Sequence, residues 1–176
     1  GMVLLATLTA SASASLDFTT LINSTYDEYV FELVNIVPAS ASILWMRTSA
    51  NAGSSWDAAA GNYLYMGQEA VTGVTPASLI DGGANAVKIA FGTNNISTTA
   101  AHGGISGTVK LFAPSGTVAF KQITALLTWA LSAVAVANTL MSGNRAAAAA
   151  VDGVRFMMST GNIASGSIRM YGVRKT

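Results

Sequence analysis

The fold is decided near the C-terminus, by the stretch Val154-Arg-Phe-Met-Met-Ser-Thr-Gly-Asn-Ile-Ala-Ser-Gly-Ser-Ile-Arg-Met-Tyr-Gly-Val173. Two runs of strand-like composition flank residues 159–162, a cluster of turn formers whose glycine tolerates a positive φ. In the second run, Ile168 and Met170 alternate with polar or aromatic residues, which is typical of a strand with one solvated face. The stretch therefore predicts a β-hairpin that closes an antiparallel sheet.

A second copy of this pattern occurs earlier in the chain. Residues 105–112 match residues 164–171 in chemical class at nearly every position, with glycine on glycine, Lys110 on Arg169 and an aromatic residue at the end of each copy. Two copies are too few and too far apart for a solenoid. Two similar strands at this separation indicate a two-sheet sandwich with internal pseudo-symmetry.

The rest of the chain supports an all-β fold. About ten short strand-like runs are separated by turn signals, the pattern of a two-layer antiparallel β-sandwich, jelly-roll-like in topology. The predicted strands lie within 2–14, 15–22, 26–37, 42–48, 62–67, 86–91, 107–113, 118–131, 154–159 and 167–173. Residues 67–85 and 92–104 show no clear period and are predicted as loops. Residues 144–151 are compatible with a turn of helix, a small-residue strand or an ordered loop.

Composition bounds the class of protein. The 176 residues fit one domain, expected to span residues 2–176, since Gly1 before Met2 resembles a tag remnant. Only 10% of the residues are charged, against roughly 25% in an average soluble domain. Such a hydroxyl-rich surface is typical of proteins that live in assemblies or face sugars. The alternative is a low-charge sandwich that is marginally soluble alone. The net charge of +1 gives no basis for nucleic-acid binding, and the lack of cysteine excludes disulfides and thiol chemistry.

The few charges are segregated along the chain. Seven of the eight acidic residues precede residue 82, and eight of the nine basic residues follow it. Two domains of opposite sign would produce this pattern, but each half is too short to close a good core. We therefore expect N-terminal acidic strands to pair with C-terminal basic strands, where opposite charges across a ladder are mildly favourable.

Two apolar segments invite a membrane assignment. Residues 2–14 superficially resemble a secretory signal, but they lack a basic start and are interrupted by threonines, so a first strand is expected. Residues 123–140 contain no charge and approach the length of a membrane span. Their first half alternates with period two across threonine-rich text, which predicts a strand and no membrane span.

A turn motif lies at Ser49-Ala-Asn-Ala-Gly-Ser-Ser-Trp56 and resembles the Asp-box of sialidases. In that motif an acidic or amide side chain caps a tight turn, a glycine supplies positive φ, and an aromatic ring packs beneath. The resemblance predicts a structural hairpin between 42–49 and the next strand, built by Ser49, Asn51, Gly53, Ser55 and Trp56. The motif occurs once, so a repeating propeller is not supported.

The sequence gives little support for a catalytic site. His102 is the only histidine and lies in a loop with no nucleophile-elbow motif. A glycosidase needs two carboxylates, and Glu28 and Glu32 would lie about 13 Å apart on one strand face, which is too far. Asp27 and Asp57 lie in expected turns, where capping is the ordinary role. We expect no catalytic residue, no metal site and no cofactor.

A ligand site is expected, if anywhere, around the Asp-box-like turn. Trp56, Tyr63 and Tyr65 cluster there, and aromatic rings on the rim of a sandwich stack on sugar faces. Packing beneath the turn for Trp56, and sheet packing or a subunit contact for the tyrosines, are the structural alternatives.

The stretch 161–172, with residues 154–156 before it, resembles the C-terminal signature of uncharacterised phage and prophage virion proteins encoded near tail genes. Looser similarity extends to 16–18, 26–38 and 47–56. The resemblance implies a non-enzymatic structural or appendage protein of a virion, assembled in the bacterial host cytoplasm and associated with the tail or tail fibre. It implies a homo-oligomer, most simply a trimer, that contacts other virion proteins. A carbohydrate-binding module that recognises the cell surface, and a glycosidase, are the second and third readings.

Overall fold

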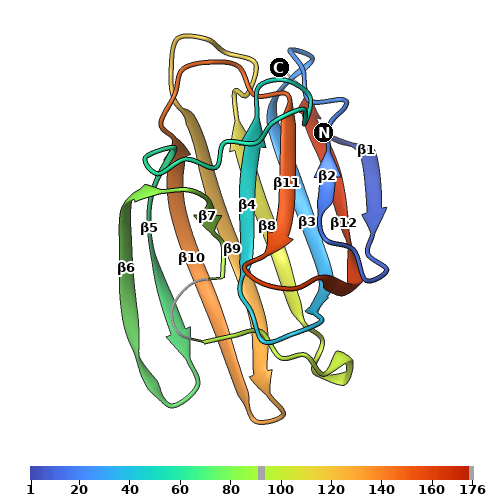
Figure 1. Cartoon of the computed structure of the whole chain (residues 1–176), viewed down its shortest axis with the longest axis vertical. Helices are drawn as coiled ribbons and strands as arrows, with labels where there is room; N and C mark the ends of the chain where they lie inside the picture. The colour runs from blue at the N-terminus through green and yellow to red at the C-terminus, as the bar shows by residue number, and fades with distance from the viewer. Residues whose placement is uncertain (91–93, 175–176) are drawn as a thin grey trace.

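Two antiparallel sheets pack face to face in the computed structural model, which describes residues 1–90 and 94–174 (Figure 1). The large sheet has the strand order β1-β12-β3-β8-β9-β10-β5-β6, and the small sheet has the order β2-β11-β4-β7. The predicted two-layer antiparallel sandwich is confirmed. The strands are β1 (Met2–Thr9), β2 (Leu16–Phe18), β3 (Tyr26–Pro38), β4 (Leu44–Ser49), β5 (Tyr63–Val71), β6 (Val74–Ala84), β7 (Val87–Lys88), β8 (Ile105–Phe112), β9 (Lys121–Ser132), β10 (Ala135–Arg145), β11 (Gly153–Met158) and β12 (Ile163–Arg174).

The core lies between the sheets and is one connected cluster of buried apolar side chains. It forms because alternate residues of each strand point inward, as in β9, where every second residue from Lys121 to Trp129 is buried. At its centre, the rings of Phe18, Phe31 and Phe156 meet edge to face, with centroids 5.3–6.3 Å apart. These rings come from β2, β3 and β11, so the aromatic cluster joins the two sheets.

The two copies of the repeated pattern, β8 and β12, lie on either side of β3 in the large sheet. Gly107 and Gly166, which match in the repeat, both have positive φ, at 139° and 108°, and both lie beside register shifts in the pairing with β3. A Cβ at either glycine would collide with a backbone carbonyl oxygen of the neighbouring strand. The repeat is therefore a repeated bulge, which only glycine allows.

The predicted C-terminal hairpin is wrong. β11 pairs with β2 and β4 in the small sheet, whereas β12 pairs with β1 and β3 in the large sheet. The turn at 159–162 thus carries the chain from one sheet to the other. Turn residues specify a reversal but not whether the two strands bond to each other, because non-local packing decides which strands pair.

The structure corrects one predicted loop, decides one open segment and shortens one predicted strand. The segment 67–85, predicted as a loop, contains the end of β5 and all of β6, an edge strand with solvent on much of its surface and hence no hydrophobic period (Figure 1). Residues 144–151 leave β10 at Arg145 and continue as a loop, which settles the three open alternatives. The predicted strand 86–91 is shortened to β7, and residues 91–93, its end and the start of the predicted loop 92–104, lie outside the described residues.

The expected pairing of N-terminal acids with C-terminal bases is confirmed. Among the described residues, four ion pairs join an acid before residue 60 to a base after residue 109, while a fifth, Lys88–Asp81, is local. The four are Lys110–Glu28, Arg145–Asp57, Arg155–Asp17 and Arg169–Glu32.

The segment 123–140 forms most of the β9–β10 hairpin. The strand predicted from the alternation of its first half is β9, whereas β10 was not predicted. In the described part of the chain, no helix is long and apolar enough to cross a membrane.

Candidate functional site

The outer side of the large sheet, which faces away from the small sheet, is divided into two halves. On β12, β3 and β8 it carries two ion pairs: Lys110 with Glu28 at 2.7 Å, and Arg169 with Glu32 at 3.1 Å. The Tyr171 hydroxyl also donates to the Glu32 carboxylate at 3.2 Å. We call this half the charged face. Each acid lies on β3 and each base on the strand beside it, so the charges are held in cross-strand pairs.

The other half, formed by the outward residues of β9, β10, β5 and β6, is the uncharged face. None of its outward side chains is charged in the described ranges. Instead it exposes large apolar side chains that stand among Thr, Ser, Asn and Gln. These are Leu64 (40% exposed), Met66 (53%), Ile80 (73%), Leu126 (59%), Val136 (55%) and Leu140 (62%).

The strand register brings these apolar side chains together. Leu126 lies opposite Leu140 across the β9–β10 ladder, and Met66 lies opposite Ile80 across the β5–β6 ladder. An open groove of about 470 Å³ runs over this surface, lined by Met66, Ile80 and Leu140 together with small polar residues. Contiguous exposed apolar surface of this kind, with polar residues around it, marks an interaction site more often than a solvated sheet face.

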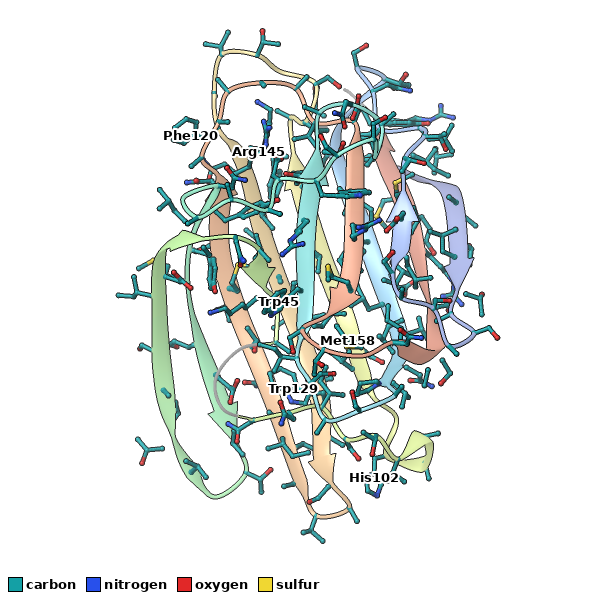
Figure 2. All side chains as sticks on the ribbon, viewed as in Figure 1. Trp45, His102, Phe120, Trp129, Arg145 and Met158 are labelled. Carbon is teal, nitrogen blue, oxygen red and sulfur yellow. The ribbon has the colours of Figure 1, made fainter. Side chains whose placement is uncertain are left out.

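Beneath the uncharged face, charges point inward and are buried. Arg145, labelled in Figure 2, donates from Nε to Asp57 Oδ2 at 2.6 Å and from Nη1 to the carbonyl of Ala149 at 2.9 Å. Lys121, opposite Arg145 on β9, is 1% exposed and donates to the carbonyls of Ala119 and Ala148. Burial, and next the Arg145 charge, lowers the pKa of Lys121. The alanine-rich loop after β10 thus supplies the carbonyl acceptors that two buried cations need.

A second buried charge, Glu69 on β5, lies farther along the same inner side. It is 4% exposed, accepts a hydrogen bond from Asn94 Nδ2, and lies opposite Thr139 of β10. Burial raises the pKa of the Glu69 carboxyl, against which the Asn94 bond acts. Within the described ranges, Glu69 Oε2 and Thr139 Oγ1 have no hydrogen-bond partner. This cluster is less completely paired than the one around Arg145.

The Asp-box-like turn has the chemistry that the sequence predicts but not the connection. Asn51 Oδ1 accepts from the backbone N–H of Ser55 at 2.9 Å, and Ser49 Oγ accepts from the N–H of Gly53 at 2.9 Å. Gly53 has a φ of 83°, and the Trp56 ring packs beside it. However, the turn links β4 of the small sheet to β5 of the large sheet, so the predicted hairpin is corrected to a crossover between layers.

The three predicted ligand-binding rings do not form an exposed platform. Tyr63 is fully buried, and its hydroxyl accepts from the Thr48 backbone N–H at 2.7 Å; burial raises its pKa to about 12. Tyr65 is 4% exposed, and its hydroxyl donates to Asp81 at 3.2 Å. Trp56 is half-buried beneath Arg155. The structure does not support the ligand role of the two tyrosines, because inward alternation of β5 places both rings in the core.

The candidate acids and the histidine are also placed in structural surroundings. Glu28 and Glu32 each pair with a base, as described above, and Asp57 binds Arg145. His102, at one end of the sandwich in Figure 2, lies with Nδ1 2.8 Å from Ser97 Oγ. Ser97 Oγ also accepts from the Thr99 backbone N–H at 3.2 Å, which is a turn bond. No carboxylate orients this histidine among the described contacts, and no group of three metal-ligating side chains assembles in the described ranges.

Sequence reasoning missed the uncharged face. The signal was present, since Leu126, Val136 and Leu140 fall on the polar parity of their strands, out of phase with Leu127 and Trp129.

Comparison of the chain with protein-family models, curated protein sequences and solved structures gave no significant match.

Proposed function

We propose that the protein is a non-enzymatic structural component of a phage virion, associated with the tail or tail fibre, that docks against copies of itself and neighbouring virion proteins. The virion setting rests on the sequence resemblance. The docking role rests on one structural observation, the uncharged face of β9, β10, β5 and β6. A trimer is the stoichiometry that the resemblance implies.

The uncharged face suits contact with another copy of this chain. Charged side chains are depleted at the centre of protein interfaces, because burying an unpaired charge is costly. In a cyclic trimer, one part of the uncharged face of each copy contacts another part of the same face on the next copy, and both parts are uncharged and apolar. Covering several of these partly exposed apolar side chains in one contact removes apolar surface from water, which favours association against its entropy cost.

The test is the mass of the protein in solution, measured by light scattering across a dilution series. The wild-type chain is expected to be an oligomer that dissociates on dilution. Leu140→Lys should weaken association by at least about tenfold, because it removes one apolar contact and buries a charge. Leu4→Lys is the matched control, since Leu4 is 54% exposed on β1, at the opposite edge of the same sheet.

Two results would contradict the proposal. One is a wild-type chain that stays monomeric at all concentrations. The other is an oligomer that Leu4→Lys disrupts as strongly as Leu140→Lys, because contact would then not depend on the uncharged face.

A further inference from the structure

The solvent-facing side of the small sheet carries a row of two adjacent arginines with a tryptophan ring at each end. The Arg155 guanidinium carbon lies 4.3 Å from the centroid of the Trp56 ring. Arg155 lies directly opposite Arg47 in the β11–β4 ladder. The Arg47 guanidinium carbon in turn lies 5.9 Å from the centroid of the Trp45 ring. The row is therefore Trp56, Arg155, Arg47 and Trp45, across β4, β11 and the Asp-box-like turn.

The charge of this row is only half neutralised. Arg155 donates two hydrogen bonds to Asp17, at 2.8 and 2.6 Å. Arg47 donates from Nε to the carbonyl of Asn85 at 3.1 Å, and it forms no ion pair with the described residues. Like charges directly opposite each other on a sheet are destabilising. Asp17 therefore neutralises only one of the two guanidinium groups, that of Arg155, and the Nη donors of Arg47 have no acceptor among the described contacts.

Trp45 completes a mixed polar and apolar surface beside Arg47. Its ring is half-buried, and its Nε1 is buried with no hydrogen-bond partner in the described part of the chain. Figure 2 labels Trp45 beside β4. Lys88, opposite Trp45 on β7, is paired with Asp81 at 3.2 Å, so it adds no net charge. The uncompensated charge on this side of the sheet is therefore that of Arg47.

We infer that Arg47 and Trp45 form a binding site for a sugar ring that carries a carboxylate. A guanidinium matches a carboxylate in plane and charge, with two parallel N–H donors. The indole offers an apolar surface for the ring, and the Nε bond to Asn85 holds the guanidinium in place, which reduces the entropy lost on binding. A neutral sugar lacks the ion pair, and a free carboxylate lacks the ring contact. This inference is independent of the proposed docking role.

The probe is an oligosaccharide of glucuronic acid, titrated by calorimetry and followed by tryptophan fluorescence. Glucose oligosaccharide of equal length and free acetate are the comparison ligands. The acidic oligosaccharide should bind more tightly than either. Arg47→Gln should lower its affinity at least about tenfold, the loss expected for a hydrogen bond to a charged group, and Trp45→Leu should also weaken it. Arg174→Gln is the matched control, because Arg174 is an exposed cation at the end of β12.

Circular dichroism and thermal unfolding check that each variant is folded. The inference is overturned if the acidic oligosaccharide does not bind, if the glucose oligosaccharide or acetate binds equally well, or if Arg174→Gln lowers affinity as much as Arg47→Gln. Binding should persist in Leu140→Lys, so failure of docking and failure of this site are distinguishable.

Discussion

The two halves of the large sheet have opposite polarity. On β12, β3 and β8, charges point outward in cross-strand pairs, and the inward residues, such as Phe31, Leu33 and Ile168, are apolar. On β9, β10 and β5, the outward residues are uncharged, and the inward residues include Lys121, Arg145 and Glu69. Burying charge is costly and leaving it on a solvated surface is not. Covering the outward side of the second half would therefore bury no charge, whereas covering the charged face would.

The largest effect on stability is expected in the buried cluster around Arg145. Asp57→Asn leaves the Arg145 guanidinium buried without its carboxylate, and Arg145 is only 7% exposed. Loss of one partner of a buried ion pair costs about 3–5 kcal/mol. Urea denaturation should show that decrease in the free energy of unfolding. A change below about 1 kcal/mol would mean that the inward charges are solvated, and the contrast between the halves would disappear.

Glu69→Gln should raise the free energy of unfolding, by an amount that depends on pH. Burial raises the folded-state pKa of Glu69, so the folded state binds a proton that the unfolded state releases at lower pH. The contribution of Glu69 to stability is fully present below its unfolded pKa and is lost as pH rises through the raised pKa. The variant should therefore gain stability over wild type as pH increases from about 4.5. Denaturation at several pH values measures this gain in the free energy of unfolding. A gain that is the same at every pH would show that the raised pKa of Glu69 is not its cause.

On the charged face, Glu28→Gln should have a small effect. The Lys110–Glu28 pair is partly exposed, at 43% and 24% for the two side chains, and exposed pairs contribute about 0–1 kcal/mol. Salt should reduce the difference between variant and wild type. Denaturation with and without 1 M NaCl, a concentration that screens such pairs, is the measurement. A decrease in the free energy of unfolding as large as that of Asp57→Asn would show that the outward ion pairs stabilise the fold as much as the buried one.

The smallest effect on stability is expected from a charge placed on the uncharged face. Leu126→Lys replaces a side chain that is 59% exposed in the monomer, and exposed substitutions usually change stability by less than about 0.5 kcal/mol. Denaturation of the dilute, monomeric protein should therefore give nearly the wild-type value. A loss of several kcal/mol would mean that folding itself requires this surface to be uncharged.

The layered antiparallel fold and the charge pairing follow from the sequence, because alternation and charge sign are local properties. Tyr63 and Tyr65 show the limit, since the sequence places both on the predicted strand 62–67 but does not say which side of that strand faces the core. The turns before β5 and β12 show a second limit, because turn residues do not say whether the chain stays in one sheet. The position of Arg155 opposite Arg47 depends on the β11–β4 register, which non-local packing decides.

The most direct test of the docking role uses the lack of cysteine in the chain. A spin label at Gln122→Cys reports on the uncharged face, and a label at Thr7→Cys reports on β1, at the opposite edge of the sheet; both positions are exposed. We predict dipolar coupling between copies for the Gln122→Cys label, removed by dilution with unlabelled protein, and weaker coupling for the Thr7→Cys label. Equal coupling at both sites, or stronger coupling at Thr7→Cys, would contradict the account.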